Sequence, residues 1–373
     1  MSVDVELTFE RPAPTGPLLE VDDLRTHFLT PRGRVKAVDG VSFTLDRGRT
    51  LGLVGESGSG KTILARSIMN LLPKLNVSRS GSVKFMGREL VGLGDREMRS
   101  LLGAEIAMVF QDPLSSLNPV MTIGKQITEA LRLQTGMGKK EARLTAIALL
   151  RSVGIPEPEQ RFTEYPHLLS GGMRQRVMIA LALACGPKLL FADEPTTALD
   201  VTVQAQILNL LQDNQKDRYM AMVLVTHDLG VVAGRTDEIA VMYGGRIVEQ
   251  APTSVLFSRM QHPYTEALLR SIPRVENPSH TKLEVIRGRP PDLINPPPGC
   301  PFSVRCPYAQ DDCREVVPTL QEGAGFGHRF ACFHPLGDRG PAPVEVTKKP
   351  PVDGQEPLVD GQEPAVDGQE PGG

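Results

Sequence analysis

Hydrophobic and polar residues alternate in the first part of this chain. The alternation spans residues 19–24 and 41–45, which predicts half-buried strands of an antiparallel sheet, and residues 81–85 are expected to form a further strand. Residues 1–17, which precede these strands, are rich in proline and are expected to be disordered.

After residue 50 the pattern changes, because short continuous apolar runs replace the alternation. These runs predict buried strands at 189–193, 222–226 and 238–242. Residues with helical spacing lie at 62–72, 174–184 and 203–214. Strands that alternate with helices indicate a largely parallel sheet, so we expect an α/β core within residues 18–270.

Apolar residues recur at helical spacing in the middle of the chain. Ile123, Ile127 and Leu131 form one series, and a second series runs over residues 142–153. We therefore expect a helical insertion in the α/β core over about residues 115–185.

The composition changes again near the C-terminus. Residues 271–340 are rich in proline, arginine and cysteine and have little periodicity. This composition predicts a small separate domain that needs a cross-link, such as a bound metal or disulfides, to fold. Residues 341–373 contain three copies of the unit Val-Asp-Gly-Gln-Glu-Pro. Such an acidic unit cannot bury a core, so we expect a disordered tail.

Charge and hydropathy exclude several classes of protein. The net charge is −3 and the basic residues form no stripe, so nucleic acid is not an expected partner. No apolar run approaches the roughly 20 residues that a membrane span needs, and the acidic N-terminus does not have the pattern of a signal peptide. These features predict a cytosolic chain.

A glycine-rich loop is the first segment that carries chemistry. It follows the apolar run 51–54 and fits the pattern G-x-x-x-x-G-K-S/T with Gly55, Glu56, Ser57, Gly58, Ser59, Gly60, Lys61 and Thr62. The glycines let backbone N–H groups close around phosphate oxygens, while the lysine neutralises phosphates and the threonine hydroxyl can ligate Mg²⁺. The loop therefore predicts a nucleotide site.

Two later segments make this prediction more specific. Leu-Ser-Gly-Gly-Met occupies residues 169–173, and the apolar run 189–192 is followed by Asp193 and Glu194. Hydrolysis of a nucleotide needs a metal ligand and a group that positions water. A carboxylate at the end of a buried strand suits the metal.

The three motifs, in this order, resemble those of the ATPase subunits of ABC transporters. The resemblance implies that the protein binds ATP and Mg²⁺, with Thr62 and Asp193 near the metal and Glu194 polarising the attacking water. It also implies a glutamine loop at Gln111, whose side chain contacts the metal and the water. His227 resembles the switch histidine that contacts the γ-phosphate.

The same resemblance implies that two ATPase subunits meet head to tail. Ser170, Gly171 and Gly172 correspond to the signature that binds the γ-phosphate held by the opposite subunit, although Met173 replaces the usual glutamine. Asp200, in the segment Ala-Leu-Asp, corresponds to the loop that communicates across the dimer.

One aromatic residue is a candidate for contact with adenine. Phe28 lies upstream of the phosphate loop, where the family usually has a tyrosine that stacks on the base. Simple packing in the core is the alternative for this ring.

Longer segments resemble one branch of the family. Residues 103–113, 165–173 and 262–265 resemble the D-type ATPase subunit of oligopeptide and dipeptide importers. The resemblance implies peptide uptake at the cytoplasmic face of the cell membrane. The implied partners are a second, different ATPase subunit, two transmembrane permease subunits and an extracytoplasmic peptide-binding protein.

Three other functions are alternatives. Nickel or antimicrobial peptides are open as cargo, because an ATPase subunit does not touch the cargo. A soluble ABC ATPase outside transport is less favoured because the chain has a single cassette and no heptad run. A catalytically inactive subunit is less favoured because Glu194 and His227 are present.

Four of the five cysteines cluster in the C-terminal segment, at Cys300, Cys306, Cys313 and Cys332. In a reducing cytosol this clustering favours a metal over disulfides. The gaps are wider than the C-x2–4-C pairs of zinc ribbons. Some members of the family hold an iron–sulfur cluster in this segment, so the resemblance implies a four-iron four-sulfur cluster, with zinc or no metal as open alternatives. Cys185 is expected to be a buried apolar side chain.

Overall fold

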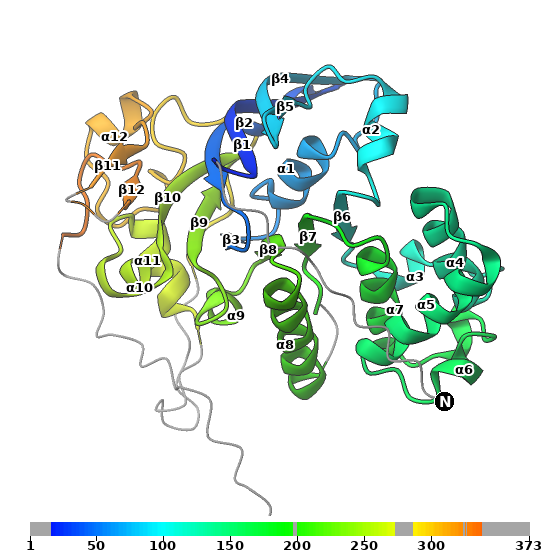
Figure 1. Cartoon of the computed structure of the whole chain (residues 1–373). Coiled ribbons are helices and arrows are strands. Elements are labelled where there is room, and N and C mark those ends of the chain that lie inside the picture. The colour runs from blue at the N-terminus through cyan, green and yellow to red at the C-terminus, as the bar shows by residue number, and fades with distance from the viewer. Residues whose placement is uncertain (1–15, 197–199, 273–285, 324, 326, 338–373) are drawn as a thin grey trace, which may run out of the picture.

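The computed structural model describes residues 16–196, 200–272, 286–323, 325 and 327–337, which form two sheets with helices around them (Figure 1). The predicted disordered ends lie outside these residues, apart from residues 16 and 17. No helix in the described ranges is long and apolar enough to cross a membrane.

The alternating segment forms an antiparallel sheet in the order β2-β1-β4-β5. Its strands are β1 Leu19–Thr30, β2 Gly33–Leu45, β4 Val77–Phe85 and β5 Arg88–Glu89. The three predicted strands are confirmed, but each is longer than expected. Register shifts after Val21 interrupt the period of two in β1, which hid its second half from the sequence pattern.

In the described part of the chain, a second sheet has the order β11-β12-β10-β9-β3-β8-β7-β6. Its strands are β3 Thr50–Val54, β6 Ile106–Val109, β7 Leu189–Asp193, β8 Ala221–Thr226, β9 Glu238–Tyr243, β10 Arg246–Pro252, β11 Gln321–Glu322 and β12 Arg329–Phe330. Neighbours from β6 to β9 pair in parallel, as predicted. Every residue of β3, β7 and β8 is buried, since helices or the other sheet cover both faces.

The helices around this sheet include the predicted insertion. They are α1 Lys61–Ile68, α2 Asp95–Leu101, α3 Pro113–Ser116, α4 Ile123–Thr135, α5 Lys139–Ser152, α6 Pro158–Arg161, α7 Gly171–Leu183, α8 Val201–Asp217, α9 Leu229–Val232, α10 Thr253–Arg259, α11 Pro263–Arg270 and α12 Asp312–Glu315. In Figure 1, α3 to α7 gather on one side of the molecule, away from α12 and β11. Ile127 and Leu131 of α4 are buried in one apolar core with Ala146 and Leu150 of α5.

The region between the two sheets has a core of its own. Leu64 and Ile68 of α1 belong to one buried apolar cluster with Leu24 of β1 and Leu53 of β3. The helix that follows the phosphate loop is therefore anchored to both sheets, which holds the loop in place.

The cysteine-containing segment extends the large sheet. β12 pairs with β10, which places Phe330 opposite Glu249 and Arg329 opposite Gln250. Cys300 and Cys313 belong to the same apolar core as the central strands. The described part of this segment is thus joined to the sheet and core of the preceding domain, so a separate small domain, as its composition predicts, is not confirmed.

Candidate functional site

The predicted phosphate loop connects β3 to α1, and its shape depends on two glycines. Gly60 has φ +106°, and a Cβ there would lie 2.2 Å from the Ala37 carbonyl oxygen. A Cβ on Gly55 would lie 2.1 Å from the Met242 carbonyl oxygen. Side chains are excluded at both positions, so the backbone N–H groups of the loop stay open to a ligand.

Lys61 is held inside the loop. Its Nζ donates to the carbonyl oxygens of Gly55 at 2.6 Å and Glu56 at 2.9 Å, and the side chain is buried. Burial lowers the pKa of Lys61, although the nearby carboxylates of Glu194 and Asp193 oppose that shift. A buried ammonium whose partners are two carbonyls and, at 3.5 Å, the Ser59 hydroxyl is suited to meet the charge of a phosphate.

Thr62 and Asp193 form a candidate Mg²⁺ site. The Thr62 hydroxyl donates to Asp193 Oδ1 at 2.9 Å, and Asp193 is fully buried. Asp193 Oδ2 is buried and has no hydrogen-bond partner among the described residues. Burial raises the pKa of this carboxyl above its usual value. A buried carboxylate with an unsatisfied oxygen beside a hydroxyl fits a hard divalent cation.

The side chain of Glu194 is held between two of the other predicted residues. Gln111 Nε2 donates to Glu194 Oε2 at 3.1 Å, and His227 Nδ1 lies 3.3 Å from Glu194 Oε1. The Glu194 backbone has φ +44°, a strained conformation for this residue, and its N–H donates to the Val225 carbonyl of β8 at 2.9 Å. Three strand ends therefore bring Gln111, Glu194 and His227 together, as the sequence predicted.

These groups open into a cavity of about 730 Å³. Its lining includes the phosphate loop, Gln111, Glu194 and His227, as expected. It also includes residues that the sequence analysis did not identify, Ala37, Leu268, Ser271, Ile286 and Leu293. No local motif marks these residues. Ala37 reaches the cavity from β2, and the other four reach it because the chain returns to the cavity after β10.

Other predicted site residues lie outside this cavity. Phe28 is on β1 opposite Val35 of β2 and is not among the lining residues, so its contact with adenine stays a prediction. Ser170 is the N-cap of α7 and accepts from the Met173 N–H at 3.3 Å, with Gly171 and Gly172 in the first turn. Their role toward a second subunit stays a prediction.

The loop that contains Asp200 is described in part. Residues 198 and 199 lie outside the described residues. The Asp200 carboxylate is the N-cap of α8 and accepts from the Val203 N–H at 2.9 Å. This contact gives Asp200 a structural role, and its part in communication across a dimer stays a prediction.

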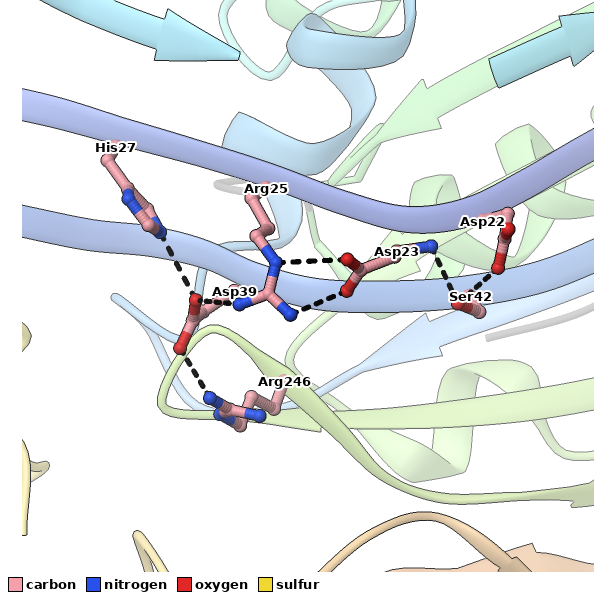
Figure 2. Close-up of polar contacts among 7 residues, drawn as sticks. All are labelled: Asp22, Asp23, Arg25, His27, Asp39, Ser42 and Arg246. Atoms are coloured by element: carbon pink, nitrogen blue, oxygen red, sulfur yellow. Dashed lines mark hydrogen bonds and ion pairs between the residues drawn. The ribbon is translucent and has the colours of Figure 1, made fainter. Parts of the chain in front are cut away.

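A polar network joins the two sheets beside the cavity (Figure 2). Asp39 of β2 accepts from Arg25 at 3.0 Å, lies 3.2 Å from His27 Nε2 and pairs with Arg246 of β10 at 2.5 Å. Burial alone would raise the pKa of Asp39, but the charges of Arg246 and Arg25 and the contact with His27 leave it below its usual value. Ala37, two residues earlier on β2, lies against Gly60 of the phosphate loop.

The four clustered cysteines line one small cavity, of about 20 Å³. All four are free thiols, and the Cys300 N–H donates to the Cys313 carbonyl at 2.8 Å. Burial raises the pKa of Cys306 to about 11 and that of Cys332 to about 12, and the neighbouring thiols add to both shifts. A bound cation would reverse these shifts.

His262 also lines the cysteine cavity, although the sequence analysis gave this residue no chemical role. Its Nδ1 accepts from the Tyr264 N–H at 3.0 Å, while its Nε2 is buried without a hydrogen-bond partner among the described residues. Burial lowers the pKa of His262 to about 3, so the ring is neutral. Cys185, which was expected to be buried, is only half-buried, and it lies just after α7 and does not line this cavity.

Comparison with known proteins agrees with this geometry. A family model described as ABC transporter matches residues 38–197, and one described as oligopeptide/dipeptide transporter, C-terminal region, matches residues 248–313. The oligopeptide transport ATP-binding protein OppD of Salmonella typhimurium is 48% identical over 331 residues, which cover 89% of this chain and 98% of that protein. The chain belongs to the ABC transporter ATP-binding family.

The similarity to a second ATP-binding protein extends over nearly the same share of this chain. The dipeptide transport ATP-binding protein DppD of Escherichia coli is 47% identical over 87% of this chain and 98% of its own length. The dimeric structure of a bacterial ABC transporter cassette has a TM-score of 0.57 and 26% identity, over 63% of this chain and 98% of that chain. The predicted family and the ATPase activity are thus confirmed.

Proposed function

We propose that this chain is the ATP-hydrolysing subunit of an ABC importer that powers the uptake of oligopeptides or dipeptides. The observation that carries this proposal is the extent of the similarity. It covers the cassette and the C-terminal segment alike, and it covers 98% of relatives whose names specify oligopeptide or dipeptide transport. Nickel and antimicrobial peptides are not favoured as cargo, because no such name occurs among these relatives.

The proposal includes partners and a location. The signature residues Ser170–Gly172 lie outside the chain's own nucleotide cavity, and similar cassettes form dimers. We therefore infer a second ATPase subunit whose signature completes this site, and the resemblance to peptide importers implies that its sequence is different. Two permease subunits and an extracytoplasmic peptide-binding protein complete the importer, and the chain works at the cytoplasmic face of the membrane.

From the geometry we infer a task for each residue of the site. Loop amides and Lys61 bind the phosphates of ATP, and Thr62 and Asp193 hold Mg²⁺, which supplies charge stabilisation to the transferred phosphoryl group. The Glu194 carboxylate orients the attacking water. Gln111 and His227 fix the position of that carboxylate from two sides.

Uptake of a labelled tripeptide tests the cargo. In the native host, deletion of this gene should abolish uptake, and the wild-type gene should restore it, while a Glu194→Gln gene should not. The Glu194→Gln protein serves as the matched control because it keeps the fold and the nucleotide cavity. Unchanged peptide uptake in the deletion strain would overturn the peptide assignment.

We also propose that Cys300, Cys306, Cys313 and Cys332 hold a metal centre, with a four-iron four-sulfur cluster as the first candidate. Four thiols around one cavity form a suitable ligand set, and the buried His262 Nε2 adds a polar atom that has no hydrogen-bond partner among the described residues. Among the described residues, only Asp312, Cys313 and His334 bring three donor atoms within 4.8 Å of one another, so no three of the four thiols are close enough to share one zinc ion without moving together.

Metal analysis after anaerobic purification separates these candidates. About four irons and four sulfides per chain, lost in Cys306→Ser and retained in Cys185→Ser, would support the cluster. One zinc per chain would support the alternative. Absence of metal from the anaerobic protein would overturn the proposed centre and leave the ATPase assignment intact.

A further inference from the structure

The second residue of the phosphate loop carries a charge that faces the nucleotide cavity. Glu56 lines this cavity, and its carboxylate receives two hydrogen bonds from one arginine of the C-terminal segment. Arg305 Nη1 lies 2.6 Å from Glu56 Oε2, and Arg305 Nη2 lies 2.9 Å from Glu56 Oε1. Only 4% of the Arg305 side chain is exposed, so water screens this bidentate pair weakly.

Arg305 is itself held in place on several sides. Its Nε donates to the Arg287 carbonyl at 2.8 Å, and its Nη2 donates to the Ile286 carbonyl at 3.2 Å. Its Nη1 also contacts the Tyr243 hydroxyl at 3.2 Å. The guanidinium is therefore fixed before it meets Glu56, and Ile286 brings the same segment into the nucleotide cavity.

The backbone of Glu56 has a second contact with the C-terminal part of the chain. The Glu56 N–H donates to the hydroxyl of Tyr264, a fully buried residue in the first turn of α11, at 2.8 Å. The ring of Tyr264 packs on those of Tyr243 and Phe302, with centroids 4.5 Å and 5.3 Å apart. The Glu56 carbonyl meanwhile accepts from Lys61.

The turn that carries Arg305 also carries two of the clustered cysteines. Arg305 lies between Cys300 and Cys306, which line the cysteine cavity together with Phe302. Within the turn, the N–H groups of Arg305 and Cys306 both donate to the Phe302 carbonyl at 2.9 Å. One tight turn thus faces the cysteine cavity on one side and the phosphate loop on the other.

The ion pair between Arg305 and Glu56 affects how the phosphate loop binds a charged nucleotide. A carboxylate in a phosphate loop repels the polyphosphate of ATP unless a cation neutralises it. Arg305 supplies that cation and also directs the carboxylate. We propose that Arg305 is a positioning residue for ATP, which neutralises Glu56 and holds the phosphate loop open to the nucleotide. This inference deepens the ATPase function and rests on it.

A mutant cycle tests the inference by nucleotide affinity. The full-length protein would be titrated with Mg²⁺ and a slowly hydrolysed ATP analogue, ATPγS, by calorimetry. Arg305→Ala should weaken binding by about tenfold or more, because it leaves a part-buried carboxylate unpaired beside the phosphates. Arg305→Ala combined with Glu56→Gln should recover most of the lost affinity, because the repelling charge is gone.

Recovery of affinity by Glu56→Gln shows whether Arg305 acts by positioning the phosphate loop or only by supporting the fold. If Arg305 only held the fold together, removing the Glu56 charge as well would not restore binding. Arg305→Lys should lie between the wild type and Arg305→Ala, since it keeps the charge and loses the bidentate geometry. Unchanged affinity in Arg305→Ala, or a double variant as weak as that single variant, would overturn the proposal.

Two controls complete the experiment. Arg88→Ala removes an exposed pair with Glu97 in β5 and α2 and should leave affinity unchanged. Metal content and the melting temperature of each variant show whether the C-terminal segment stays intact. Failure of the wild type to bind ATPγS would refute the ATPase assignment itself, which keeps the two failures distinguishable.

Discussion

Thr62 and Asp193 are 131 positions apart in the sequence, yet the hydroxyl of one donates to the carboxylate of the other at 2.9 Å. The other carboxylate oxygen of Asp193 is buried and has no hydrogen-bond partner among the described residues. Burial of this charge costs stability, as the raised pKa of Asp193 indicates. The buried carboxylate of Asp193 therefore lowers the stability of the fold, but it lies where it can hold Mg²⁺.

Asp193→Asn should separate stability from activity. The substitution keeps the shape and removes the buried charge, so in EDTA the variant should melt no lower than the wild type at neutral pH. In the assembled importer, its Mg²⁺-dependent ATP hydrolysis should fall by about 10²-fold or more. Asp213→Asn, at an exposed site of α8, is the control and should change neither value. A lower melting temperature in EDTA would contradict our account of Asp193.

Glu194→Gln should block hydrolysis and spare binding. The amide keeps the size of the side chain but cannot take up a proton, so ATP hydrolysis should fall by about 10²–10⁴-fold while the affinity for MgATP stays within a few-fold. Gln111→Ala should have a smaller effect, because it removes one of the groups that position the carboxylate and leaves His227 in place. Steady-state kinetics and calorimetry on the same preparations provide the test. Equal hydrolysis rates in Glu194→Gln and the wild type would point to a catalytically inactive subunit.

Gly60→Ala and Gly58→Ala form a matched pair. Both residues have positive φ, +106° and +81°, but only a Cβ on Gly60 meets the backbone, 2.2 Å from the Ala37 carbonyl oxygen. Gly58 has open space around its Cβ position. Gly60→Ala should lose ATP binding and about 2 kcal/mol or more of stability, whereas Gly58→Ala should lose about 1 kcal/mol. Similar losses in the two variants would show that the contact with Ala37 is not the cause.

The Asp39 network predicts a specific response to acid. The pKa of Asp39 is below its ordinary value of 3.8, so the ionised form stabilises the fold above that pH. This stabilisation should disappear as the pH falls through the lowered folded pKa. Asp39→Asn should cost about 1–3 kcal/mol at pH 7, because Arg246 loses its anion and Arg25 keeps only its pair with Asp23, and the difference from the wild type should vanish once the pH is below the lowered pKa of Asp39.

Thermal melts between pH 2 and pH 7 measure this difference. Asp22→Asn is the control, since Asp22 accepts only a 3.4 Å contact from Ser42 and is exposed. A pH-independent gap between Asp39→Asn and the wild type would contradict the assignment of the acid response to Asp39.

Elements with strong local patterns were predictable from the sequence. The continuous apolar run of β7 is where it was predicted, and β8 begins one residue earlier than predicted. Helix α7 was expected from Arg174 but begins at Gly171, because the Ser170 cap allows two glycines in the first turn. The period of two in β1 is broken by register shifts, so only half of that strand was visible.

The sequence by itself determined the parts of the site whose chemistry needs a fixed local spacing. The phosphate loop, Asp193 with Glu194, and the strand-end residues Gln111 and His227 all depend on short motifs or on the ends of apolar runs. A glycine is needed where the backbone has a positive φ, and the end of an apolar run marks where a parallel strand ends. Both features can therefore be recognised in the sequence without knowledge of the fold.

Only the tertiary structure decided how the C-terminal segment contributes. The contact between Arg305 and Glu56 spans 249 positions, and neither residue stands in a pattern that indicates the other. The same holds for Ile286 and Leu293 in the nucleotide cavity. Contacts of this kind follow from the pairing of β12 with β10 and from packing on a common core, which depend on the whole fold and leave no local periodicity.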